Sequence, residues 1–287
     1  MKTNVRKKKD GALLLVAPMA IWTILFVVVT LGYILYLSFT TRAENGMGVT
    51  AQLTLDNYLK LLNPSYLKVL GNSLKLAAIT TLICLLVGYP FGYLMARLSP
   101  VARSVVMLLI IVPFWTNALI RIYGWRILLM GNGPINTLLM NLGLIQEPLK
   151  LLYTDGAVLL GMVYALIPFM ILPTFTTVDK LDFSVVEAAR DLGASPLHAF
   201  FTVTVPLTLP GLMAGCVLVF IPSMGLFFLN DLLGGSKSVL AGGLIQQLIN
   251  SRDLPMAAAL SVLLLAVTGA VIAVYRKVGG TGDMSMF

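Results

Sequence analysis

The sequence predicts an all-α membrane protein with six transmembrane helices. Of its 287 residues, 58% are hydrophobic and only 11% are charged, and the mean hydropathy is +0.92. A soluble domain typically carries about 25% charged residues. This chain therefore has too little polar surface to cover a water-facing globule, and its apolar side chains are expected to face lipid.

The length of the uncharged runs supports this fold class, because a helix needs roughly 20 apolar residues to cross the hydrocarbon core of a bilayer. Six runs of that kind fill most of the chain, and they predict helices near residues 11–41, 73–97, 104–126, 156–178, 203–230 and 254–276. We treat residues 1–287 as a single transmembrane domain. The first apolar run far exceeds the 7–15 residues of a cleavable signal core, so we interpret it as a retained helix.

Basic residues predict the orientation of the chain. The net charge is +8, and 11 of the 20 Lys and Arg residues lie in segments that are inside if the N-terminus is cytoplasmic. Lys and Arg concentrate on the cytoplasmic side of membrane proteins. Anionic headgroups of the membrane lipid are a sufficient partner for the N-terminal cluster, Lys2 to Lys9. No nucleic-acid partner is expected.

The sequence offers little for enzymatic chemistry. Cys84 and Cys216 lie within apolar runs and are expected to be packing residues. His198 is the sole histidine, and no group of residues has metal-ligand spacing. The Gly234 to Lys237 run lacks the spacing of an ATP-binding loop. We therefore expect no catalytic residue, no metal and no cofactor.

An ion-coupled secondary transporter remains an alternative. Such transporters usually carry ionisable residues in the middle of their membrane helices, and this sequence has few of them.

Prolines and glycines predict where helices break or approach each other. Prolines stand inside the expected helices at positions 90, 113, 168, 173 and 222, and broken helices are tolerated where neighbours or a watery cavity satisfy the backbone. The pairs Gly88–Gly92 and Gly211–Gly215 fit the small-residue spacing that lets helices pack closely.

The inner loop, residues 179–202, has its own local structure. Ser184 and Glu187 fit a capping box that starts a helix, Gly193 is placed to end it, and Ser195 with Pro196 starts another. Val185, Ala188, Ala189 and Leu192 form an apolar stripe. One interpretation is a helix lying on lipid headgroups. Acidic residues at least balance basic ones here, which favours a protein groove over an anionic surface.

The same loop carries a family resemblance. It reads Glu187-Ala188-Ala189, then Gly193, then Val203-Thr204-Val205-Pro206. This spacing resembles the cytoplasmic coupling loop of permeases in binding-protein-dependent ABC importers, with valine in place of isoleucine and leucine. Four segments, residues 111–124, 187–195, 225–235 and 252–255, look like spermidine/putrescine permeases of the PotB type. The similarity extends over roughly residues 15–276.

The resemblance implies a type I ABC importer permease fold in the bacterial cytoplasmic (inner) membrane. It also implies a second homologous permease, two ATP-binding subunits and an extracytoplasmic polyamine-binding protein as partners. Glu187, Ala188, Ala189 and Gly193 would seat the coupling loop in the ATPase subunit. An importer for another small solute is the alternative within this class.

A polyamine pathway should offer aromatic faces and carboxylates, since the substrate is a flexible polycation. The candidates are Trp115, Asn117, Tyr123 and Asp231. Each also has a plainer interpretation: Trp115 can face lipid or pack, Tyr123 can belong to an interfacial aromatic belt, and Asp231 can cap a loop. Arg121 does not suit a cation path, and we expect it to be a structural ion pair or a gate.

Overall fold

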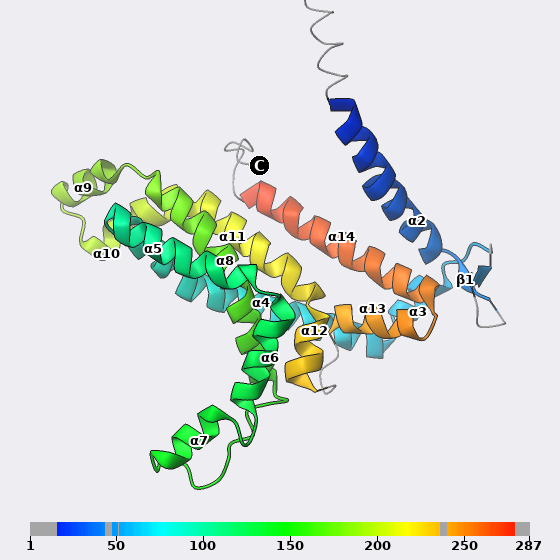
Figure 1. Ribbon diagram of the computed structural model, residues 1–287. Coiled ribbons are helices and arrows are strands. Elements are labelled where there is room, and N and C mark those ends of the chain that lie inside the picture. The colour runs from blue at the N-terminus through cyan, green and yellow to red at the C-terminus, as the bar shows by residue number, and fades with distance from the viewer. Residues whose placement is uncertain (1–15, 44–47, 51, 236–239, 279–287) are drawn as a thin grey trace, which may run out of the picture. The chain divides into compact units, whose positions relative to one another are not determined.

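The computed structural model describes residues 16–43, 48–50, 52–235 and 240–278 (Figure 1). The N-terminal basic cluster, the start of the first expected helix, Lys237 and residues 279–287 lie outside these residues. The described residues form helices joined by loops, with one short antiparallel hairpin, β1 (Thr41–Arg42) with β2 (Val49–Thr50). The chain divides into two compact units, Met1–Asn63 with Ile245–Ala266, and Pro64–Leu244 with Val267–Phe287.

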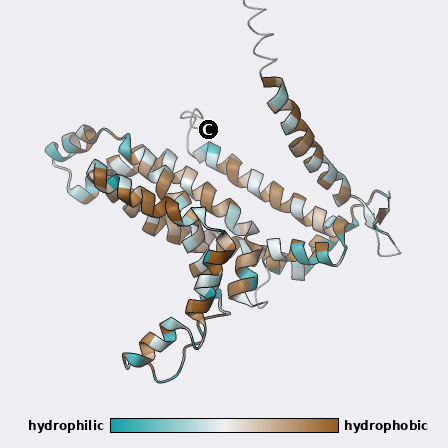
Figure 2. Ribbon diagram, viewed as in Figure 1, coloured by the Kyte–Doolittle hydropathy of each residue, from teal (hydrophilic) through white to brown (hydrophobic). Residues whose placement is uncertain are grey.

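Among the described residues, five helices are long and apolar enough to cross a membrane, or six if one bent pair counts as a single span. The five are Val16–Ser38, Pro64–Ala96, Asp155–Asp179, Pro196–Gly225 and Leu254–Lys277. Figure 2 shows that apolar residues dominate along these helices. The all-α membrane class predicted from the sequence is therefore confirmed.

The first unit contains the span Val16–Ser38, which includes a π-helical turn, η1 (Ile24–Val28), and α2 (Val29–Ser38). A short helix, α3 (Asp56–Leu61), packs against the end of α2. The buried Asn57 amide donates to the carbonyl oxygens of Ser38 and Thr40, at 3.0 and 2.8 Å. These bonds satisfy carbonyls that the helix end leaves unpaired.

The second unit is built on α4 (Pro64–Ala96), α8 (Asp155–Asp179) and α11 (Val205–Gly225), which pack against one another. A Cβ on Gly88 would lie 2.8 Å from Met170 Cγ, and one on Gly211 would collide with Thr177. Such contacts are tighter than side chains normally allow. The close helix approach predicted from the glycine spacing is therefore confirmed.

Helix α4 corrects the expected second helix, which was placed at 73–97. It begins at Pro64, about nine residues earlier. Lys68 and Lys75 ended the uncharged run in the sequence, but a helix can continue beyond the hydrocarbon, where lysines are solvated. Proline suits the first turn of a helix because its missing N–H would have no partner there.

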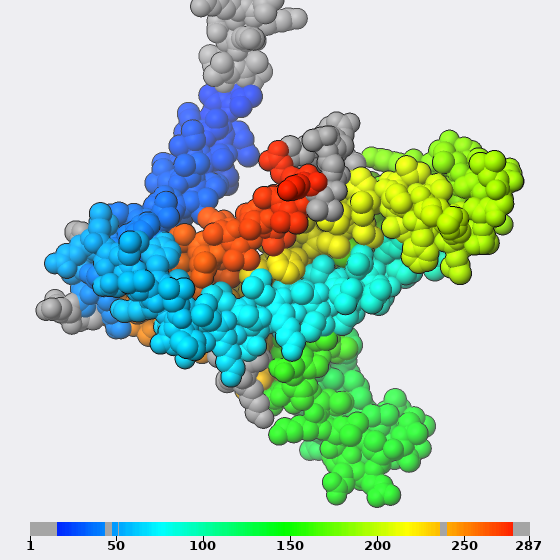
Figure 3. All heavy atoms as spheres, turned by 180° about the vertical axis from the view of Figure 1, so that it is seen from behind, coloured from blue at the N-terminus to red at the C-terminus, as the bar shows by residue number. Residues whose placement is uncertain are grey.

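The expected third helix, 104–126, is divided at the proline that the sequence marked as a possible break, Pro113. The chain forms α5 (Pro100–Ile111), a 3₁₀ turn η2 (Val112–Trp115) and α6 (Ala118–Leu129), with a bend of 95° between the α5–η2 and α6–α7 segments. Pro113 cannot donate a helical hydrogen bond, and Thr116 is extended (φ −83°, ψ 148°). After the bend, α6 and α7 (Pro134–Asn141) project away from α4 (Figures 1 and 3).

The remaining elements follow the expectation more closely. Helix α8 agrees within one residue at each end, and α14 (Leu254–Val278) begins as predicted. The fifth span ends at Gly225 rather than 230, because Leu226 leaves helical geometry (φ −77°, ψ 63°). Short turns follow, α12 (Phe227–Leu229) and η4 (Asn230–Gly234). Helix α13 (Ala241–Asn250) stands where the sequence predicted only a loop.

Candidate functional site

The inner loop forms a helical hairpin from α9 (Phe183–Asp191) and α10 (Pro196–Ala199), which we call the coupling hairpin. The Asp182 carboxylate, not Ser184, caps α9, since its Oδ1 accepts the Ser184 backbone N–H at 3.0 Å. The predicted Ser184 capping box is therefore wrong by two residues. The same hydrogen bond holds the pKa of Asp182 below its ordinary value.

The turn of the hairpin is as predicted. Gly193 has φ of +93°, and its N–H donates to the Arg190 carbonyl at 2.9 Å, while the Ala194 N–H donates to Ala189 at 3.1 Å. This pair of bonds is the Schellman pattern, which favours glycine at the left-handed position. Ser195 then caps α10 by accepting the His198 N–H at 3.2 Å.

The second arm of the hairpin is continuous with the membrane span. Helix α10 passes through a π-helical turn, η3 (Phe200–Thr204), into α11. The second arm of the hairpin and the fifth span are therefore one uninterrupted helical segment. The sequence did not show this continuity, because its apolar run begins only at Val203.

The outer surface of the hairpin includes two leucines that the described chain leaves uncovered. Leu192 is 91% exposed and Leu197 is 72% exposed. Glu187, Ala188 and Gly193 are also exposed, and Ala189 is partly so. Only Val186 on this helix is buried. The described chain therefore covers neither of these two leucines.

An aromatic cluster ties the hairpin to α4. The Tyr93 ring packs edge-on against Phe183 and Phe200, with centroids 6.5 and 5.5 Å apart. The Arg97 guanidinium lies 4.6 Å from the Tyr93 centroid and 5.0 Å from that of Phe183. Sequence reasoning missed this contact. Tyr93 and Arg97 are four residues apart, about one helical turn, and this spacing alone could have indicated that their side chains meet.

The predicted pathway residues lie in the second unit, two of them at the bend before α6 and the other two on α6 itself and on η4. Trp115 is 82% exposed and stands at the bend, next to Asn117, whose side chain caps α6 by accepting the Leu119 N–H at 2.8 Å. Tyr123 lies further along α6, and Asp231 lies in η4, both exposed. Helix α6 and η4 share one buried core, which includes Ile122 and Leu233.

Two arginines of α6 lie over aromatic rings. The Arg121 guanidinium is 4.4 Å from the Phe114 centroid and 5.9 Å from that of Tyr164. Arg126 is 5.9 Å from the Tyr123 centroid and donates to the Tyr153 hydroxyl at 3.2 Å. Among the described residues Arg121 makes these cation–π contacts and no ion pair, so the ion-pair expectation is wrong, and the alternative of a gate stays a prediction. The sequence identified Arg121 but not these ring partners.

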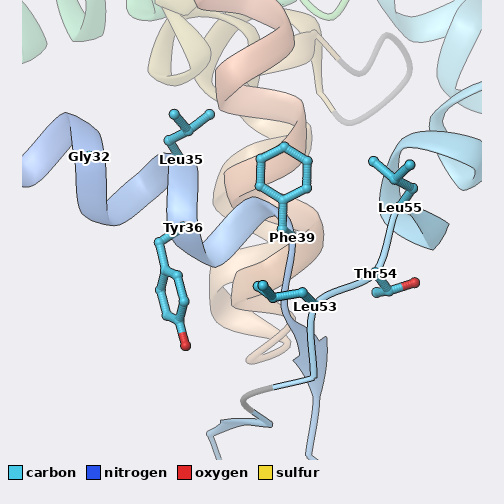
Figure 4. Close-up of a pocket in the computed structure, with 7 residues that line it drawn as sticks. All are labelled: Gly32, Leu35, Tyr36, Phe39, Leu53, Thr54 and Leu55. Atoms are coloured by element: carbon cyan, nitrogen blue, oxygen red, sulfur yellow. The ribbon is translucent and has the colours of Figure 1, made fainter.

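A groove in the first unit is a poorer candidate for a polycation (Figure 4). Its volume is about 630 Å³, and its lining residues are Gly32, Leu35, Tyr36, Phe39, Leu53, Thr54 and Leu55. None of these carries a charge. The lining suits hydrocarbon better than ammonium groups.

Comparison with known proteins places these features in a family. A family model described as "Binding-protein-dependent transport system inner membrane component" matches residues 88–278. The spermidine/putrescine transport system permease protein PotB of Escherichia coli (strain K12) is 47% identical over 257 residues, covering 89% of this chain and 93% of that protein. PotB of Haemophilus influenzae is 44% identical, covering 89% and 90%.

Solved structures show the same fold. A bacterial alginate ABC transporter, solved with an alginate-bound periplasmic protein, has a chain that matches with a TM-score of 0.77 and 14% identity, covering 99% of this chain and all of that one. A MetNI methionine ABC transporter matches with a TM-score of 0.51 and 14% identity, covering 76% and 98%. These matches confirm the predicted permease fold.

Proposed function

The chain belongs to the family of binding-protein-dependent transport system inner membrane components, and from this premise we propose that it is a permease subunit of an ATP-driven polyamine importer. It forms half of the translocation pathway for spermidine or putrescine. The observation that carries this proposal is the similarity to PotB proteins, at 44–47% identity along nearly the whole length of both chains.

The family favours ATP-driven transport over the ion-coupled alternative. In this proposal the chain itself hydrolyses nothing, and the energy comes from a pair of ATP-binding subunits. A second homologous permease completes the pathway, and an extracytoplasmic polyamine-binding protein delivers the substrate. The N-terminus then lies in the cytoplasm, on the same side as the coupling hairpin.

Coupling would pass through Glu187, Ala188, Ala189 and Gly193. Two geometric features support this role: the small side chains of the alanines permit close docking, and Gly193 supplies the left-handed turn between α9 and α10. The exposed Leu192 and Leu197 extend the same surface. The aromatic cluster of Tyr93, Phe183 and Phe200 supports transfer of the motion to α4.

The substrate pathway would involve Trp115, Asn117, Tyr123 and Asp231. Trp115 and Tyr123 offer exposed aromatic faces, and Asp231 offers an exposed carboxylate. A carboxylate and aromatic rings are the groups that an alkyl polycation binds. Asn117 contributes by fixing the start of α6 at the bend.

The test is reconstitution of the complete importer in proteoliposomes, with its partner permease, ATP-binding subunits and binding protein. Polyamine-loaded binding protein should stimulate ATP hydrolysis and drive vanadate-sensitive accumulation of radiolabelled spermidine or putrescine. The polyamine assignment is lost if only another solute, such as sulfate or a metal ion, stimulates the same complex. The importer assignment is lost if uptake persists without ATP.

A further inference from the structure

Arg121 occupies an aromatic site at the bend between α5 and α6. Its guanidinium lies 4.4 Å from the Phe114 centroid on η2 and 5.9 Å from the Tyr164 centroid on α8. Phe169, also on α8, packs edge-on against Phe114, with centroids 6.0 Å apart and planes at 88°. Two rings therefore contact the cation directly, and the Phe169 ring packs behind one of them, Phe114.

The guanidinium is held by ring faces rather than by polar groups. Its Nε atom is buried and has no hydrogen-bond partner among the described residues. A desolvated cation over an aromatic face is stabilised by the ring quadrupole. That attraction does not require arginine, because any alkylammonium group of similar size gains the same contact.

The site is also accessible. Phe169 is 40% exposed, and Trp115, the neighbour of Phe114 in sequence, is 82% exposed. Charged side chains in membrane segments generally face the bundle interior or a watery cavity and mark a substrate path. Phe114, Tyr164 and Arg121 are themselves partly exposed, so the described chain leaves part of the ring cluster uncovered.

The α8 backbone adds acceptors at the same residues. Pro168 and Pro173 have no N–H, so the carbonyls of Tyr164 and Phe169, four residues before each proline, lose their usual helical donors. An arriving ammonium group can donate to a carbonyl that the helix does not use. Aromatic rings and spare carbonyls thus come from the same two residues.

We propose that the ring cluster of Phe114, Tyr164 and Phe169 is a binding subsite for one ammonium group of the transported substrate, and that Arg121 occupies it when substrate is absent. This inference rests on the proposed function. Exchange of the guanidinium for a substrate ammonium keeps one cation on the rings at every stage. Arg121 also keeps small inorganic cations off an otherwise empty site.

The test measures equilibrium binding of radiolabelled spermidine to the assembled permeases and ATP-binding subunits in nanodiscs, before any binding protein is added. Arg121→Met removes the resident cation, and binding should tighten about tenfold. In the Arg121→Met background, Phe114→Leu should weaken spermidine binding about tenfold. In the parent the effect should be much smaller, because the lost ring weakens the contact of the Arg121 guanidinium as well as that of the substrate ammonium, and the two compete for the site. Phe26→Leu, a change at an exposed ring elsewhere in the chain, should leave binding unchanged.

A purely structural contact between Arg121 and Phe114 predicts a different pattern. In that case Arg121→Met would bind no more tightly than the parent, or Phe114→Leu would have equal effects in both backgrounds, and either result overturns the subsite. If Arg121→Met does not assemble, Arg121→Gln gives the same comparison. Stimulation of ATP hydrolysis by polyamine-loaded binding protein, measured in the same preparation, tests the proposed function separately, and its absence would overturn both.

Discussion

Arg103 and Asp179 form an ion pair with an N–O distance of 2.7 Å, which joins α5 to the last residue of α8. The second terminal nitrogen of Arg103 donates to the Ala96 carbonyl, at the end of α4, also at 2.7 Å. The guanidinium lies 5.6 Å from the Phe175 centroid. One side chain therefore ties three helix ends together beside the coupling hairpin.

Replacing Arg103 by methionine should destabilise the permease. The change removes the ion pair and also a charge-assisted bond to a helix-end carbonyl, together worth about 2 kcal/mol. The melting temperature of the purified complex in detergent should fall. Asp179→Asn is the matched control, because it weakens only the partly exposed ion pair, worth up to about 1 kcal/mol. Equal losses in the two variants would contradict the role given to the Ala96 bond.

Leu192→Ser should weaken assembly with the ATP-binding subunits without affecting folding. Leu192 is 91% exposed, so it contributes almost nothing to the folded subunit. Loss of a buried leucine contact costs about 2 kcal/mol, or more than tenfold in affinity. Retention of the ATP-binding subunits during purification measures the effect. Leu142→Ser, at a 64% exposed leucine just after α7, should behave like the parent. The docking surface is refuted if both variants retain their partners equally.

Gly211→Ala should destabilise the contact between α8 and α11. The added methyl group would meet Thr177 and lie 2.8 Å from the Pro173 carbonyl oxygen. Overpacking of this kind typically costs about 1–3 kcal/mol. Thermal unfolding in detergent measures it. Gly269→Ala is the control, because nothing lies within 4 Å of its added methyl, and there alanine should be neutral or slightly stabilising.

Trp115→Leu and Asp231→Asn should each lower polyamine uptake while membrane abundance stays constant. Both side chains are exposed, so neither change should reduce folding stability by more than about 0.5 kcal/mol. Loss of a cation–π face or of a carboxylate should reduce the initial rate of uptake several-fold. Radiolabelled spermidine uptake, normalised to membrane abundance by immunoblot, provides the comparison. Unchanged rates in both variants would remove these residues from the pathway.

Local signals predicted the coupling hairpin well because its structure is local. The turn at Gly193 depends on a left-handed backbone conformation that glycine adopts without strain, and the helix start at Ser195 depends on one side chain and its own neighbours. The cap of α9 was assigned to Ser184 because the capping-box pattern was complete there. The carboxylate of Asp182, two residues earlier, accepts the hydrogen bond from the Ser184 N–H and caps the helix instead.

The bend in the third expected helix was harder to predict. Pro113 was visible, but proline alone permits either a kink or a break. The extended Thr116 and the cap at Asn117 together convert it into a turn of 95°. The ring partners of Arg121 come from residues as distant as Tyr164, so no local pattern identifies them.

The sequence by itself determined the membrane class, the approximate position of the spans and the form of the coupling hairpin, because hydropathy and capping act over a few residues. Only the tertiary structure decided where α4 begins, how sharply α5 and α6 diverge, and which rings surround Arg121. Those features depend on contacts between residues far apart in the chain, such as Phe114 with Phe169 and Arg103 with Asp179. Packing between distant segments leaves no periodic signal in a single sequence.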